Sequence, residues 1–157
     1  MGAILRIQPG RGSSSLIEPA IDVAANMSVW DLIEQEKFEQ ACELADLEFE
    51  QTHDILPLRN KVFALLSLGR QDDAVRLCEK IVAMNAGSTD SDFIFLGVSH
   101  WFGNDVRSAI QAWKSGLGIT YADAAGGVEA PLLLLFAAIV TRDRTACLEP
   151  LPDHDPL

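Results

Sequence analysis

The side chains best suited to chemistry in this sequence are its histidines and cysteines. His53, His100 and His154 lie far apart, and Cys42 and Cys78 fall among Leu and Ala residues at helical spacing. A metal site built from these residue types needs two ligands a few positions apart, as in Cys-x-x-Cys or His-x-x-x-His, and the sequence has no such pair. A thiol on an apolar helix face behaves as a small hydrophobic group. We therefore expect no metal site and no cofactor.

Catalysis would have to come from the polar groups around His100. The candidates for such a site are His100, Asp105, Tyr121 and Asp123. Neither a nucleophile elbow nor a nucleotide-binding fingerprint occurs in the sequence. The glycine pair at 126–127 continues as Val-Glu-Ala-Pro, whereas a phosphate loop continues with Lys and then Ser or Thr. We predict a non-enzymatic protein, and an enzyme with a site near His100 and Asp123 is the alternative.

The charge of the chain is strongly acidic. Its 23 Asp and Glu residues against 12 Lys and Arg give a formal charge of −11. Such a chain repels the phosphate backbone of nucleic acids and attracts basic proteins. Nine of the acids lie between Asp31 and Asp54, where Lys37 is the only basic residue. This run is typical of a solvated helix face, or alternatively of a landing surface for a basic partner. We expect a basic protein or peptide as partner, and no nucleic acid.

The cysteine count and the N-terminal residues bear on location. The three cysteines are an odd number without close pairing, which is typical of reduced thiols. The N-terminal residues MGAILRIQPG lack the continuous apolar stretch of a secretory signal, because Arg6, Gln8 and Pro9 interrupt it. We expect a cytoplasmic protein with no membrane segment.

Three segments of the chain align on an alanine. They are KFEQACELADLEFE, RQDDAVRLCEKIVA and VRSAIQAWKSGLGI, and their anchors Ala41, Ala74 and Ala109 lie 33 and 35 residues apart. Apolar residues recur at i, i+3, i+4 and i+7 in the first two segments, which predicts helices. Self-similarity at this period is the signature of stacked supersecondary units.

An apolar-rich run precedes each of the second and third anchors. The runs are LPLRNKVFALLSL at 56–68 and DFIFLGVSHWF at 92–102, and the short polar breaks GRQDD and GND follow them. Pro57 suits the first turn of one helix, and Gly69 is a natural helix stop. Thr89 or Asp90 can cap the next helix. The repeating unit is therefore a helix, a short turn and a second helix, about 34 residues in all.

These features together resemble the tetratricopeptide repeat (TPR) family. In the third unit the family pattern is matched by Phe93, Leu96, Gly97, His100, Ala109 and Trp113. In the second unit the small positions are Ala64, Gly69, Ala74 and Cys78, with Val62 in place of the packing glycine. The first unit keeps Phe38 and Ala41 but has Glu36 at its turn, and the closing proline of the consensus is missing from all three. The resemblance covers about 21–121. It implies an all-α fold, a short right-handed α solenoid of about three TPR-like helix pairs plus a C-terminal capping helix.

The same resemblance implies a partner-binding face. In this family the first helix of each pair lines a concave groove. Carried onto this chain, that geometry points nine residues inward: Arg59, Asn60, Phe63, Leu66, Ile94, Phe95, Val98, Trp101 and Phe102. A largely apolar and aromatic surface with a few polar anchors has the composition of an interface core. The alternative is that neighbouring helices, or the C-terminal run, bury some of these side chains.

The most apolar run of the chain, AGGVEAPLLLLFAAIV at 125–140, follows the third unit. Its uncharged part, 130–140, has 11 residues, and a helix that spans a bilayer needs ~20. Pro131 suits a first helical turn, at the place where a fourth unit would begin. We predict a capping half-unit in which Leu132 to Ile139 covers the third pair. Because the run is apolar nearly all round, we also predict that the proline-rich tail, a second copy or the partner covers its outer face.

The sequence thus predicts three regions. They are a flexible N-terminal arm at 1–18, a TPR-like helical-repeat domain at 19–142 and a proline-rich C-terminal tail at 143–157. The function indicated is an interaction module that binds a partner through an apolar concave face and an acidic surface, as an adaptor, a chaperone or an antitoxin-like immunity protein does. A self-assembling homo-oligomer is a further alternative.

Overall fold

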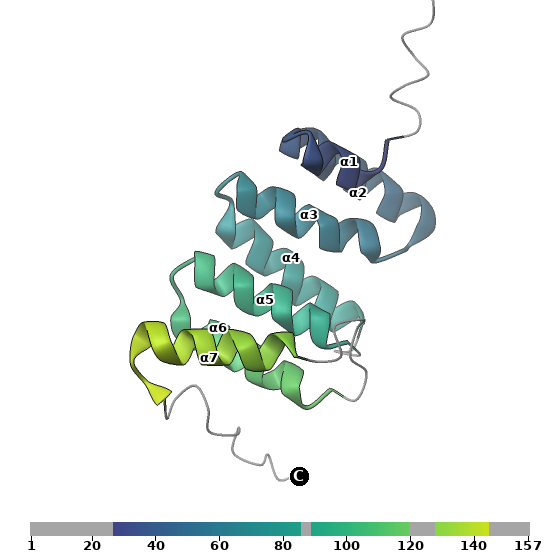
Figure 1. Cartoon of the computed structure of the whole chain (residues 1–157). Helices are drawn as coiled ribbons and strands as arrows, with labels where there is room; N and C mark the ends of the chain where they lie inside the picture. The colour runs from purple at the N-terminus through teal and green to yellow at the C-terminus, as the bar shows by residue number, and fades with distance from the viewer. Residues whose placement is uncertain (1–26, 86–88, 120–127, 145–157) are drawn as a thin grey trace, which may run out of the picture.

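The computed structural model describes residues 27–85, 89–119 and 128–144, and all regular secondary structure in these ranges is helical (Figure 1). The all-α class expected from the sequence is confirmed for them. The helices are α1 (Val29–Glu34), α2 (Phe38–Thr52), α3 (Leu56–Ser67), α4 (Gln71–Met84), α5 (Asp90–Phe102), α6 (Val106–Leu117) and α7 (Glu129–Thr141). The N-terminal arm, and the tail from residue 145 onward, lie outside the described residues.

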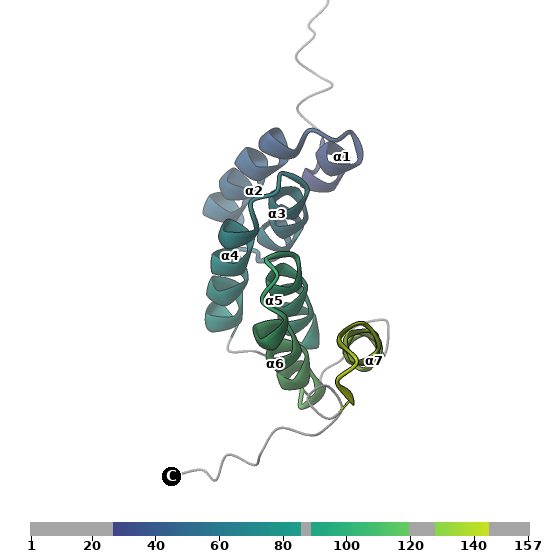
Figure 2. The same ribbon diagram turned by 90° about the vertical axis from the view of Figure 1, so that its left-hand side faces the viewer.

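The helices form two layers. Each helix contacts the next one along the chain, and α1 also contacts α3, α3 contacts α5, and α5 contacts α7. Figure 2 shows α2 and α4 at the left of the molecule, α1, α3 and α5 to their right, α6 below α5, and α7 at the right. The pair α1–α2 lies at one end of this stack and α6–α7 at the opposite end (Figure 1). The odd-numbered helices therefore share one face of the molecule.

The ends of α1, α3 and α5 share one turn geometry. Two positions after its last residue, each is followed by a residue with left-handed backbone: Glu36 (φ 58°), Gly69 (φ 71°) and Asn104 (φ 63°). The N–H of the residue after it donates to a carbonyl five positions back, as in Lys37 to Leu32 at 2.9 Å. This is a Schellman motif, which satisfies the last carbonyls of the helix. The three left-handed residues lie 33 and 35 residues apart, the same spacings as the anchor alanines.

One of the predicted helix signals differs from the expectation. In the GND break the left-handed residue is Asn104, and the adjacent Gly103 has a φ of −76°. Thr89 stands at the N-cap of α5 but makes no cap hydrogen bond with its side chain, because its hydroxyl accepts one from Arg59. Pro57 and Pro131 both lie in first helical turns, as their fixed φ allows.

The core consists of small residues at the helix crossings and larger side chains between them. Ala41, Ala74 and Ala109 are fully buried, so the backbones of their helices approach their neighbours closely. Gly97 on α5 faces Trp113 on α6, and a Cβ at Gly97 would lie 2.2 Å from the indole Nε1. One apolar cluster joins α1 to α4, and a second joins α6 to α7 around Trp113 and Leu134.

Candidate binding groove

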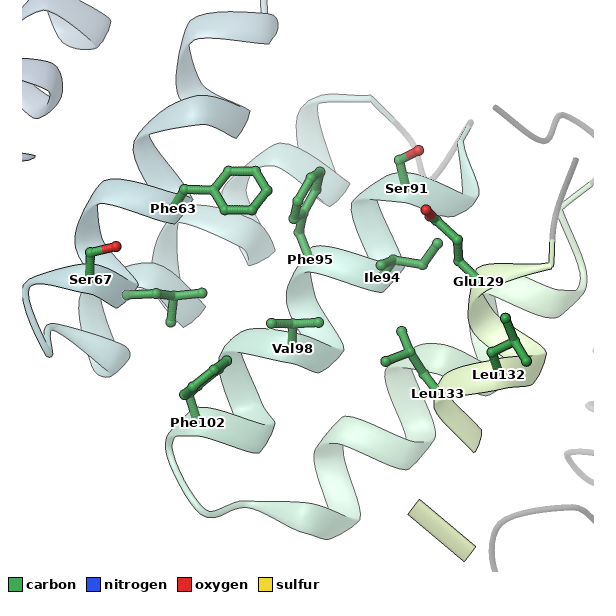
Figure 3. A pocket seen from close by; sticks show the side chains of 11 residues that line it. Phe63, Ser67, Ser91, Ile94, Phe95, Val98, Phe102, Glu129, Leu132 and Leu133 are labelled. Carbon is green, nitrogen blue, oxygen red and sulfur yellow. The ribbon is translucent and has the colours of Figure 1, made fainter. Parts of the chain in front are cut away.

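An open apolar groove of about 810 Å³ lies on the face shared by α3, α5 and α7 (Figure 3). Its lining residues are Phe63, Leu66, Ser67, Ser91, Ile94, Phe95, Val98, Phe102, Glu129, Leu132 and Leu133. Eight of these eleven side chains are aliphatic or aromatic, and Glu129 is the one ionisable group. The groove therefore suits an apolar ligand surface that needs few polar contacts.

The residues that line the groove are spaced so that they fall on one side of their helix. On α5 they recur at intervals of three or four, so that one side of the helix forms the floor of the groove. The side chains of Phe63 and Phe95 approach each other, and Leu132 and Leu133 of α7 lie across from Ile94 (Figure 3). The groove thus has one wall from α3 and the other from α7.

A row of aromatic rings runs from α1 to the groove. The centroid of Trp30 lies 5.7 Å from that of Phe63 with the planes at 84°, and Phe63 lies 5.1 Å from Phe95 at 81°. Both pairs are edge-to-face, the favoured arrangement of aromatic side chains. The indole of Trp30 is held by a hydrogen bond of 2.8 Å from Nε1 to Glu34. Trp30 and Phe63 are still 43 % and 39 % exposed, so the row offers aromatic surface to a ligand.

Six of the nine residues expected on the binding face line this groove. They are Phe63, Leu66, Ile94, Phe95, Val98 and Phe102. Asn60 is half-buried on α3 and does not line it. Trp101 points instead to the α6–α7 end, where its ring centroid lies 5.7 Å from that of Trp113 and 5.3 Å from that of Phe136. The alternative of burial by the C-terminal run therefore applies to Trp101.

Arg59, the expected polar anchor, is engaged within the chain. Its Nε donates to Asp92 Oδ1 at 2.8 Å and its Nη2 to Thr89 Oγ1 at 3.1 Å. The other carboxylate oxygen of Asp92 accepts a hydrogen bond of 2.8 Å from Asn85. The Asp92 side chain is 0 % exposed, so its charge depends on these partners. Arg59 therefore holds α3, one wall of the groove, to α5, its floor.

The sequence reasoning missed the α7 wall, although a signal for it exists. Trp30, Phe63, Val98 and Leu132 lie 33, 35 and 34 residues apart, and the last three line the groove. Extending the repeat period by one more unit from Val98 would have assigned Leu132 to the same face. The sequence predicts a capping half-unit with a covered outer face, but it does not show which side of this apolar helix faces its neighbours.

The acidic run forms a surface separate from the groove. Its nine carboxylates lie on α1, α2 and the adjoining turns, and all are exposed except Glu48, which is half-buried. Four of them, Glu39, Glu43, Asp46 and Glu50, recur at helical spacing along α2. Asp46 pairs with Lys61 of α3 at 2.5 Å. The run is thus a solvated helix face with a net excess of negative charge.

The residues of the alternative catalytic site are only partly described. His100 Nδ1 lies 3.8 Å from Asp105 Oδ2, and Tyr121 and Asp123 fall outside the described ranges. The pKa of Asp105 is lowered by its hydrogen bonds with Ser108, where it caps α6. Within the described ranges, no three His, Cys, Asp or Glu side chains gather closely enough to hold a metal ion.

Cys42 and Cys78 are buried thiols in the helix pairs. Burial raises the pKa of both, that of Cys78 to about 11. Cys78 Sγ lies 3.5 Å from Ser99 Oγ. Both therefore act as small core side chains, because the reactive thiolate form is disfavoured.

The length of the helices bears on the membrane question. Among the residues that the structure describes, none of the helices combines the length and the apolar composition needed to cross a membrane.

Comparisons of the chain with protein-family models, with curated proteins and with solved structures find no match.

Proposed function

We propose that this chain is a non-enzymatic interaction module, a short TPR-like α solenoid that holds an apolar segment of a basic partner protein in the groove between α3, α5 and α7. The repeated turn geometry and the buried alanines at the same period support the repeat architecture. The alternation of helices between two layers supports it as well. A dedicated binder of this kind acts as an adaptor, a chaperone or an immunity protein.

The observation that carries the proposal is the amount of large apolar side chain left open in the groove. Phe102 is 63 % exposed and Phe63 39 %, although both belong to a continuous apolar lining. Covering a Phe side chain is worth about 1.5–3 kcal/mol. Aromatic and aliphatic residues gathered in one concavity are the usual centre of a protein interface. The groove therefore gains most from a partner that brings its own apolar side chains.

An amphipathic helix is the form of partner that fits. The walls of the groove are themselves helices, and a third helix laid between them presents anchors at i, i+3 or i+4, and i+7. Basic residues on its solvent side are attracted by the acidic surface on α1 and α2. That attraction acts mainly on the association rate and weakens as salt is added.

A selection experiment tests the proposal. A display library of amphipathic helical peptides, about five turns long, is selected on the full chain, and the affinity of an enriched peptide is measured for matched variants. Phe102→Asp places a charge in the groove, whereas Leu47→Asp places one at a similarly exposed apolar site on α2. We expect Phe102→Asp to weaken binding by at least about tenfold and Leu47→Asp to change it little. Equal effects of the two changes, or no enriched peptide, would contradict the proposal.

A further inference from the structure

The outer side of α7 carries a second apolar surface. We define this α7 stripe as Val128, Leu132, Leu135, Phe136, Ile139 and Val140. Each of these side chains is between 48 % and 68 % exposed. They recur at intervals of three or four, which is the spacing of a helix seam that packs against another helix. The opposite side of α7, with Leu134 and Ala137, is already buried against α6.

We propose that the α7 stripe pairs two copies of this chain, with the two α7 helices antiparallel. The helix has no charged side chain between Glu129 at its first residue and Arg142 directly after its last. An antiparallel pair brings Glu129 of each copy beside Arg142 of the other, and it also opposes the two helix dipoles. A parallel pair would instead bring like charges together at both ends.

The stripe is self-complementary in that arrangement. With Glu129 opposite Arg142, Leu132 lies opposite Ile139 and Leu135 lies opposite Phe136 of the second copy. Leu132, Leu135, Phe136 and Ile139 then each meet another large apolar side chain of the stripe across a two-fold axis near the middle of the helix, while Val140 lies opposite Pro131. This is the requirement for an isologous interface, in which the same surface serves both copies.

The distribution of charge over the molecule favours the same contact. The acids of α1 and α2 lie at the far end of the stack from α7 (Figure 2). The described residues of the α6–α7 end, 106–119 and 128–144, carry four basic side chains against two acidic ones. Two copies joined through α7 therefore keep their strongly acidic ends apart, which lowers the repulsion between two chains of net charge −11.

The size of the contact sets its expected strength. A 13-residue helix is about 20 Å long. One pair of helices of this length falls at or below the lower end of the area buried in stable protein interfaces. The pairing is therefore a micromolar association. The α7 stripe lies mostly outside the groove, and Leu132 belongs to both surfaces.

Sedimentation velocity of the full chain between about 1 and 500 µM, a range suited to a small interface, tests the pairing. We expect the wild type to pass from monomer to dimer in this range. Ile139→Arg should stay monomeric with an unchanged far-ultraviolet spectrum, because Ile139 is 68 % exposed. A wild type that is monomeric throughout, or an Ile139→Arg chain that still dimerises, overturns the proposal.

Charge reversal tests the orientation. Arg142→Glu should weaken the dimer by about tenfold, since each end then holds two like charges, and Glu129→Arg/Arg142→Glu should restore it. Arg76→Glu on α4 makes the same change in net charge far from the stripe and should have little effect. If Arg142→Glu behaves like Arg76→Glu, the antiparallel arrangement is wrong.

Discussion

Gly97 on α5 packs directly against the indole of Trp113 on α6. A methyl group there would lie 2.2 Å from Trp113 Nε1, so the indole would have to move and lose its 3.3 Å hydrogen bond to the carbonyl of Ile94. Alanine in a helix is favoured over glycine by about 1 kcal/mol, but overpacking a core costs about 1–3 kcal/mol and a lost buried hydrogen bond adds to this. The steric clash therefore outweighs the gain in helix propensity.

We expect Gly97→Ala to lower the free energy of unfolding by about 2 kcal/mol, measured by urea denaturation. Gly118→Ala is the matched control, because a Cβ at Gly118 would make only an ordinary contact of 3.8 Å and its φ is −82°. A Gly97→Ala chain as stable as the wild type would show that Trp113 does not pack as described.

The ion pair of Arg59 and Asp92 gives a second prediction about the contribution of single residues to stability. Removing one partner of a buried pair costs about 3–5 kcal/mol, whereas replacing both with apolar side chains is often close to neutral. Arg59 is 23 % exposed, so the lower end of this range applies. We expect Arg59→Met to destabilise the fold by about 3 kcal/mol and Arg59→Met/Asp92→Leu to recover most of the loss. Thermal and urea unfolding of both variants provide the measurement. If the double variant is no more stable than Arg59→Met, the lost stability does not come from breaking the ion pair.

Because the Cys78 thiol is buried, we expect the fold to lose stability in alkaline solution. Its thiol has a folded-state pKa of about 11 against an ordinary value of 9.0, because burial disfavours the thiolate. Above the ordinary pKa the unfolded chain releases a proton that the folded chain retains, so stability falls as the pH rises, by up to about 1.4 kcal/mol per unit. We expect the free energy of unfolding to decline less steeply in this range for Cys78→Ala than for the wild type. Identical slopes would contradict the assignment.

At the scale of the element, α7 shows most clearly what an apolar sequence leaves open. Leu134 and Leu135 are neighbours with opposite environments, since Leu134 is 3 % exposed and Leu135 is 48 % exposed. In a dilute monomer we expect Leu134→Ala to cost about 2–4 kcal/mol and Leu135→Ala to cost less than about 0.5 kcal/mol. Urea unfolding at low protein concentration separates them, and equal losses would mean that α7 packs through another face.

The helices themselves were largely predictable. Pro57, Gly69 and Pro131 mark helix starts and stops, and their backbone preferences are local. The left-handed Glu36 was less predictable, because a non-glycine residue in that conformation costs roughly 1–2 kcal/mol and is held there by the Schellman hydrogen bonds of the turn. A tertiary contact likewise took the hydroxyl of Thr89 from the expected cap, and the sequence gives no sign of that contact.

The groove was predictable to the extent that it follows the repeat period. Phe63, Val98 and Phe102 lie where the resemblance to the TPR family places a binding face. Arg59 and Trp101 do not line the groove, for two different physical reasons. Arg59 donates a hydrogen bond to the buried carboxylate of Asp92, which lies 33 residues later in the chain. The aromatic cluster under α7 engages Trp101, and no periodic pattern shows which aromatic side chain turns toward it.

At the scale of the whole molecule, charge and apolar surface are separated. The acidic surface of α1 and α2 lies at one end, the groove lies along the odd-numbered helices, and the α7 stripe lies at the other end (Figures 1 and 2). The acidic surface is separate from the two apolar surfaces, whereas the groove and the α7 stripe share Leu132. Steering by the acids affects how fast a basic partner arrives, and the groove determines how long it stays.

The central claim is that the groove between α3, α5 and α7 holds the partner. Methyl-labelled nuclear magnetic resonance spectra of the full chain, recorded during titration with a selected helical peptide, test it most directly. We expect the largest shifts at the methyl groups of Ile94, Val98 and Leu133, with Leu47 on α2 unaffected. Shifts confined to α2 and its acidic surface, with Ile94 and Val98 unmoved, would contradict the claim.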